Sequence, residues 1–143
     1  MPLPPNASRF RGRYSRFRVT SAAATPAAIG QLHHEFAAWI GDTVHTTDGR
    51  RSDIILVVYE ALASTAETVD TGPAQLSITA RYSHKTRSLH VCVHARRTWL
   101  YRVSRLPSTR DLGLDIIHAL CDQPVFTSTS SGTEVDLRWN LFA

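Results

Sequence analysis

The stretch from Asp53 to Val69 constrains the fold more than any other part of this 143-residue chain. It runs for seventeen residues without glycine or proline, and it contains the longest apolar run, Ile54 to Tyr59. The β-branched residues of that run favour a strand, but the stretch is longer than a normal strand. Apolar residues also recur at helical spacing, at Ile55, Val58, Leu62, Ala66 and Val69. We therefore predict one buried helix, with Ser52 or Asp53 as its N-cap.

Periodic segments on either side predict seven further elements. Their ranges are strand 16–20, helix 26–40, strands 75–82 and 88–95, helix 110–122, and strands 125–129 and 133–141. Residues 41–51 lack an apolar period and are predicted to be a loop, whereas Ser108 to Asp111 resembles a capping box for the last helix. The elements follow one another without an internal repeat.

The order strand, helix, helix, strand, strand, helix, strand, strand indicates an α/β (α+β) fold. Helices on one face of a mixed, mostly antiparallel sheet form a two-layer sandwich. In the last strand, the odd-numbered apolar residues from Val135 to Leu141 are predicted to point one way, and the even-numbered polar residues from Glu134 to Asn140 the other.

Length and composition fit a single domain, because 143 residues with 43% hydrophobic side chains suffice for one core. Residues 1–15 are predicted to be a flexible basic leader, and residues 16–143 the folded domain. The longest apolar run falls well below the roughly 18 residues of a membrane span, and no apolar stretch follows the N-terminal arginines. We expect a cytoplasmic protein without membrane contact, in which Cys92 and Cys121 are small buried residues.

Basic residues gather in two segments, although the net charge is only +4. Five of the sixteen lie in the first twenty positions, and eight lie between Arg81 and Arg110; neither segment holds an acidic residue. Such segments attract acidic partners, and the aromatic residues interleaved at 9–14 and 96–102 suit nucleic acid. No helix-turn-helix or RNP signature accompanies them, so we favour a solvated basic surface or an acidic protein partner and rank nucleic-acid binding third.

Four stretches resemble the histidine-kinase-like ATPase fold of the gyrase, heat-shock chaperone, histidine kinase and MutL superfamily, also called the Bergerat-type ATPase fold. They are, in chain order, the N-box helix at 53–64, the strand before the adenine-binding Asp and Gly at 88–95, the glycine-box helix at 110–120, and the Gly-Thr motif at 132–135. The closest resemblance is to the small bacterial anti-sigma-factor serine/threonine kinases, and it covers about residues 16–141.

The resemblance implies ATP and magnesium as cofactors and transfer of the γ-phosphate to a Ser or Thr of an antagonist protein. It implies that Glu60 is the general base, that Ser64 binds magnesium, and that Gly113, Leu114 and Thr133 line the nucleotide pocket. Glu60 and Ser64, spaced i and i+4, share one helix face, as this chemistry requires. The implied partner is a sigma factor or its antagonist, and family members of this kind are often dimers.

Three positions depart from the family pattern. Ser64 stands where the family has Asn, and Asp111 stands at the first glycine of the glycine box. The residues that follow Val93 begin His94-Ala95-Arg96, without the Asp that accepts a hydrogen bond from the adenine amino group. Two hypotheses stay open, namely a kinase that retains activity and a catalytically dead pseudo-kinase that binds partners. In a plainer interpretation, Glu60 and Ser64 simply lie on a solvated helix face.

A second pattern concerns metal rather than nucleotide. His90, Cys92 and His94 alternate along one predicted strand and so point to one face, at a spacing that zinc can use. A third and fourth ligand would have to come from elsewhere in the chain. The other interpretation of this pattern is a polar face of the sheet.

Overall fold

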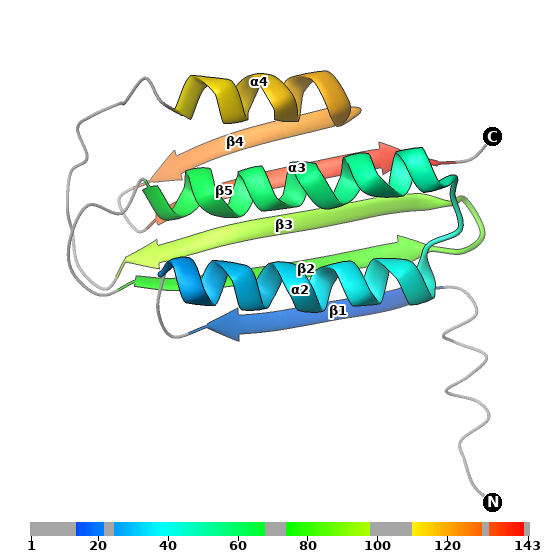
Figure 1. Cartoon of the computed structure of the whole chain (residues 1–143), viewed down its shortest axis with the longest axis horizontal. Helices are drawn as coiled ribbons and strands as arrows, with labels where there is room; N and C mark the ends of the chain where they lie inside the picture. The colour runs from blue at the N-terminus through cyan, green and yellow to red at the C-terminus, as the bar shows by residue number, and fades with distance from the viewer. Residues whose placement is uncertain (1–13, 22–24, 68–73, 98–109, 130–131, 142–143) are drawn as a thin grey trace, which may run out of the picture.

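The computed structural model describes residues 14–21, 25–67, 74–97, 110–129 and 132–141. Within them, five strands form one sheet in the order β1-β2-β3-β5-β4, and three helices cover one face of it (Figure 1). The elements are β1 (Tyr14–Ser21), α2 (Pro26–Thr43), α3 (Asp48–Glu67), β2 (Ala74–Ser83), β3 (Ser88–Arg97), α4 (Arg110–Leu120), β4 (Gln123–Thr129) and β5 (Gly132–Asn140). Residues 1–13 of the predicted leader, and Ser108 and Thr109 of the predicted capping box, lie outside the described residues.

Each of the four strand pairs in the described sheet is antiparallel. The predicted two-layer sandwich is confirmed, and this sheet contains no parallel pair. The chain leaves β3, forms α4 and β4, and returns as β5, which lies between β3 and β4. The central neighbours β3 and β5 are therefore far apart in sequence, and their pairing decides which side chains meet on either face of the sheet.

Helix α3 begins at Asp48, five residues before the predicted start. Thr47 caps it, because its hydroxyl oxygen accepts a hydrogen bond from the Arg50 backbone N–H at 3.1 Å. The Arg51 guanidinium also donates to the carbonyls of Val44 (3.3 Å) and Thr46 (3.2 Å), which orders the chain between α2 and α3. The predicted loop at 41–51 is thus wrong at both ends, since α2 continues to Thr43.

The buried surface of α3 is broader than the predicted stripe. α3 contacts α2, α4, β3 and β5, so that it is covered from several sides. Its buried apolar residues are Ile54, Val57, Val58, Ala61 and Leu62. Ile55 of the predicted stripe is only half-buried. None of the described helices is long and apolar enough to cross a membrane.

The two faces of the sheet differ as the alternation in β5 predicts. Val135, Leu137 and Trp139 are buried beneath the helices, and the Trp139 indole N–H donates to the Leu120 carbonyl at 3.0 Å. The even-numbered residues of β5 point to the opposite face, which we call the open face because none of the described helices covers it (Figure 1). Each central strand therefore presents two chemically distinct rows of side chains.

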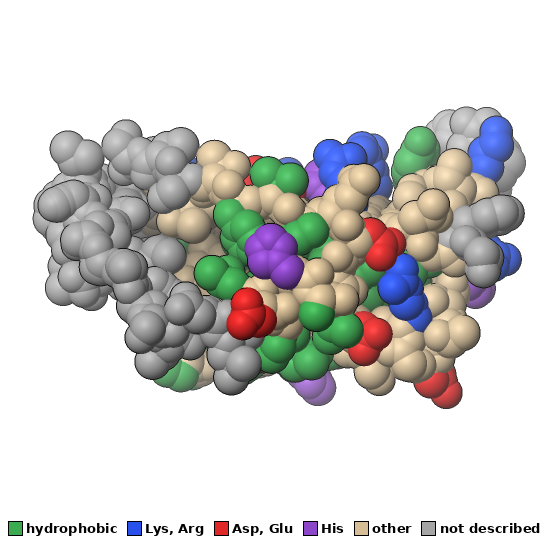
Figure 2. All heavy atoms as spheres, turned by 90° about the horizontal axis from the view of Figure 1, so that it is seen from above, with side chains coloured by type: hydrophobic (Ala, Val, Ile, Leu, Met, Phe, Trp, Pro, Cys, Tyr) green, Lys and Arg blue, Asp and Glu red, His purple; other side chains and the backbone are tan. Residues whose placement is uncertain are grey.

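Figure 2 views the edge of the sandwich formed by α4 and β4, where hydrophobic side chains reach the surface. The exposed ones on β4 are Val125 (52%) and Phe126 (39%). The ring of His118 on α4 lies 5.4 Å from that of Phe126, centroid to centroid, so the helix partly covers this edge strand.

Candidate functional site

One end of the sandwich gathers the residues that the sequence assigns to the site. The end of α3, the start of α4, the end of β3 and the start of β5 all lie at the left of Figure 1. Glu60 and Ser64 belong to the last turns of α3, and Thr133 is the second residue of β5. Gly113 and Leu114 lie near the start of α4. The fold thus brings all five predicted site residues to the same end of the molecule.

Ser64 is held inside the protein rather than on a solvated helix face. Its exposed fraction is 9%, and the neighbouring Thr65 is 1% exposed. The Thr65 hydroxyl donates to the Ala61 carbonyl at 2.6 Å, one helical turn back. Glu60 is half-buried, so its carboxylate keeps access to solvent. The interpretation of both residues as a solvated face is therefore wrong for Ser64.

The end of β3 presents a methyl group to the helices. Of the residues that directly follow Val93, Ala95 is on the helix side and fully buried, whereas Arg96 is exposed. Ala95 pairs in register with Thr133, whose side chain is 9% exposed on the same face. The register therefore sets the Thr133 hydroxyl beside the Ala95 methyl, a side chain that offers no hydrogen-bond acceptor.

Gly132 explains why the Gly-Thr pair begins β5. A Cβ atom at this position would collide with the Ala95 carbonyl oxygen and come within 3.1 Å of the Arg96 Cα. Only glycine lets β5 approach β3 this closely, and that approach places Thr133 beside Ala95. Sequence reasoning assigned Thr133 to the site but missed the supporting role of Gly132, although the Gly-Thr motif contains it.

The two α4 residues of the predicted site differ in their environment. Leu114 is half-buried and packs against the hydrophobic core, next to the fully buried Ile117 one turn on. Its apolar contacts hold the start of α4 against the rest of the domain. Gly113 precedes it in the same helix. Residues 98–109, which precede α4, lie outside the described residues.

An antiparallel sheet with helices on one face, and with these motifs gathered at one end, defines the class of histidine-kinase-like ATPase sandwiches. The chain belongs to the histidine-kinase-like ATPase domain family, whose sequence model matches residues 22–139. This confirms the family resemblance on which the predicted site residues depend. Among curated protein sequences, none matches this chain.

Two solved structures share the fold. The structure of the RsbU and RsbW domains of Rv1364c from Mycobacterium tuberculosis superposes with a TM-score of 0.67 at 16% identity, over 89% of this chain and 32% of that one. The histidine kinase domain of the blue-light activated histidine kinase from Erythrobacter litoralis EL346 superposes with a TM-score of 0.57 at 19% identity. The match covers 85% of this chain and 65% of that one. This chain thus spans about a third of the first protein and under two thirds of the second.

Proposed function

We propose that this domain is an anti-sigma-factor-like regulatory protein that acts chiefly by binding a protein partner and has weakened ATP binding. One observation carries the proposal. Ala95 presents a buried methyl at the end of β3, where the family needs an adenine-reading carboxylate. Glu60 and Ser64 nevertheless keep the spacing of the family's catalytic and metal-binding pair.

The missing carboxylate weakens the adenine side of the site. A methyl group accepts no hydrogen bond. On binding, the adenine amino group would therefore give up its hydrogen bond to water and gain none from Ala95. A hydrogen bond to a charged group contributes about 1.5–3 kcal/mol, which corresponds to roughly a ten- to a hundredfold change in affinity. The residues present therefore fit adenine poorly.

The residues on α3 fit magnesium and phosphate better. A buried Ser64 hydroxyl oxygen can ligate magnesium, which prefers oxygen ligands. Magnesium, when bound, neutralises charge on the phosphates. We assign Gly113, Leu114 and Thr133 to the lining of the nucleotide pocket. The half-buried Glu60 carboxylate would accept the proton of an attacking Ser or Thr hydroxyl, whose oxygen takes the γ-phosphoryl group while ADP leaves.

The proposed partner is a sigma factor or an anti-sigma antagonist, in the cytoplasm. The similarity to a structure that contains RsbW domains supports this choice. The described basic residues Arg16, Arg18 and Arg81 are exposed on the open face of β1 and β2, where an acidic partner would meet them. A homodimer, which the family resemblance implies, completes the proposal.

The second candidate is a pseudo-kinase that binds the same partner without phosphoryl transfer. The buried methyl of Ala95 favours this candidate. Loss of adenine recognition would prevent ATP from binding at cellular concentrations and would leave the partner-binding surface unchanged. The two candidates differ in one outcome, the phosphorylation of a purified antagonist in the presence of ATP and magnesium.

The test combines binding and transfer. Purified chain is mixed with purified sigma factors and antagonist proteins of the source organism, and complexes are resolved by size-exclusion chromatography without nucleotide. We expect a stable complex with one of them, and ATP binding by calorimetry weaker than about 100 μM. The Glu60→Gln variant should keep the complex and lose any phosphate transfer. The proposal would be contradicted if none of the candidate proteins formed a complex with the chain and the chain bound ATP with micromolar affinity.

A further inference from the structure

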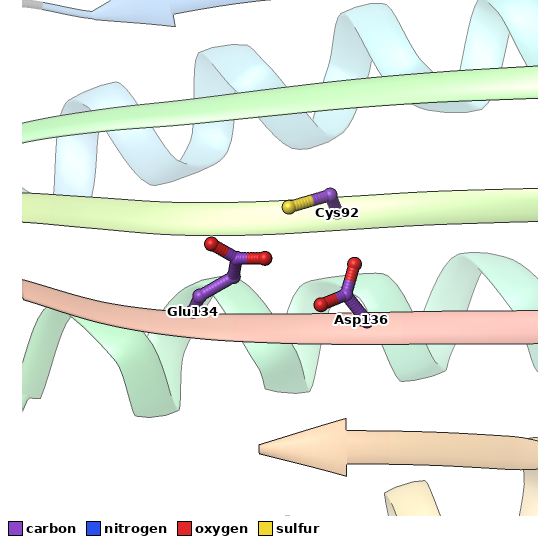
Figure 3. Close-up of side chains that lie close together, drawn as sticks. All are labelled: Cys92, Glu134 and Asp136. Carbon is purple, nitrogen blue, oxygen red and sulfur yellow. The ribbon is translucent and has the colours of Figure 1, made fainter. Parts of the chain in front are cut away.

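Three side chains of the types that ligate metal ions converge on the open face. This face of the sheet lies away from the nucleotide motifs. Cys92 lies on β3, and Glu134 and Asp136 lie on β5 (Figure 3). Cys92 and Asp136 are partners in the strand register. The Cys92 Sγ and one carboxylate oxygen from each acid all lie within 4.8 Å of one another, and all three side chains are half-buried.

Two histidines of β3 flank this cluster. His90 Nε2 lies 3.0 Å from Asp136 Oδ1, and His94 is the register partner of Glu134. The sequence pattern of His90, Cys92 and His94 predicted donors on one face but lacked a third and fourth ligand. The pairing of β3 with β5 supplies two carboxylates opposite that pattern, which makes the cluster neither a lone thiol nor a purely acidic group.

The charges in the cluster favour a cation. Glu134 and Asp136 are two residues apart on one strand and point to the same face, so their carboxylates repel each other. In the described part of the chain, no lysine or arginine forms an ion pair with either acid. Burial, followed by the charges of Asp136 and Glu134, raises the pKa of the Cys92 thiol to about 12. A divalent cation at the cluster would relieve the repulsion between the two carboxylates, and its binding by Cys92 would release the thiol proton to solvent.

A hollow in the open face borders the Cys92 side of the cluster. The hollow encloses about 670 Å³ and is bordered by both His90 and Cys92. Its other wall carries Arg16, Arg18 and Arg81, on β1 and β2. A metal ion can therefore reach the thiol from solvent without any opening of the helix layer.

We propose that Cys92, Glu134 and Asp136 bind a Zn²⁺ ion on the open face, with His94 as the fourth donor and His90 orienting Asp136. A thiolate and an imidazole select zinc over magnesium or calcium, whereas carboxylates also suit zinc. Bonds of about 2.0–2.3 Å in a tetrahedral set bring donor atoms to within roughly 3.3–3.8 Å of one another. Zinc binding would therefore draw the three donors together by about 1 Å and clamp β3 to β5.

The test uses the full chain, stripped of metal with a chelator that is then removed. Zn²⁺ is titrated by calorimetry, and Co²⁺ is used as a spectroscopic probe because a thiolate ligand gives it a charge-transfer band in the near ultraviolet. We expect one ion per chain, a higher melting temperature with Zn²⁺, and a cobalt band. Cys92→Ser should abolish the band and lower the affinity at least about tenfold.

Two variants make the result decisive. Cys121→Ser is the matched control, because Cys121 is the other thiol of the chain, is buried, and donates to the Arg138 carbonyl rather than lying in the cluster. It should leave both the band and the affinity unchanged. Glu134→Gln removes one carboxylate and should weaken zinc at least about tenfold. Absence of the cobalt band in the folded wild-type chain, or equal zinc affinity in wild type and Cys92→Ser, would overturn the proposal.

Discussion

The two faces of β3 and β5 carry opposite chemistry on the same backbone. On the helix side, Ala95 and Thr133 form a small, uncharged, buried pair at the end of the sandwich that gathers the predicted site residues. On the open face, Cys92 stands against Glu134 and Asp136, with two histidines beside them. Side chains that alternate along a strand can change independently on its two faces.

This contrast separates fold from site. Buried apolar residues, such as Val93 and Leu137, pack on the helix side of β3 and β5 and stabilise the fold without any polar group for a nucleotide. The proposed loss of adenine recognition at Ala95 would therefore leave the sandwich intact. None of the described helices packs on the open face, so charged residues and residues that can bind metal are able to gather there.

The largest expected loss of stability comes from shortening a buried side chain on the helix side of β5. Leu137 is fully buried, so Leu137→Ala should lower the free energy of unfolding by about 2–5 kcal/mol through lost burial and a cavity. Its neighbour Arg138 is exposed on the open face, and Arg138→Ala should change stability by no more than about 0.5 kcal/mol. Urea denaturation measures both. Equal losses would show that the faces do not differ as described.

A smaller loss in the free energy of unfolding is expected at Gly132, where β5 approaches the backbone of β3 closely. Gly132→Ala places a methyl against the Ala95 carbonyl and should cost about 2–3 kcal/mol, because backbone atoms must move. The matched control is Gly30→Ala in α2, where the new Cβ meets nothing within 4 Å. That change should stabilise the domain by up to about 1 kcal/mol. Denaturation midpoints of the two variants should therefore move in opposite directions.

The α3 side of the site allows a finer test. Ser64→Asn restores the amide that the family places there, and it should tighten magnesium-dependent ATP binding by up to about tenfold, or 1.4 kcal/mol. The gain should vanish when EDTA removes magnesium. Calorimetry with and without the metal separates these outcomes. An unchanged affinity with magnesium present would place the defect wholly on the adenine side.

Local patterns in the sequence predicted much of this arrangement. Alternation in β5 predicted both of its faces, and the length and apolar spacing of residues 53–69 predicted the helix that carries Glu60 and Ser64. The start of α3 was missed because residues 41–51 lack an apolar period, whereas the helix start depends on polar contacts, the Thr47 cap and the hydrogen bonds from Arg51 to nearby carbonyls. The burial of Ser64 depends on what packs around the end of α3, which periodicity does not report.

The open-face cluster depends on pairing between distant segments. His90, Cys92 and His94 were visible as one row, but their opposite residues follow from the β3–β5 register, which spans α4 and β4. Alternation says which face a residue occupies and not which strand lies beside it. For the same reason, Ala95 and Thr133 could be recognised as neighbours only in the structure.

The most direct test of the central claim restores the missing carboxylate. Calorimetry compares ATP binding by wild type, Ala95→Asp and the uncharged control Ala95→Asn, with GTP as a second ligand and melting curves as a check on folding. We predict weak binding by wild type and at least about tenfold tighter ATP binding by Ala95→Asp, with a smaller gain in Ala95→Asn and none for GTP, whose ring lacks the adenine amino group. Micromolar ATP binding by wild type, with no gain in a folded Ala95→Asp variant, would contradict the account.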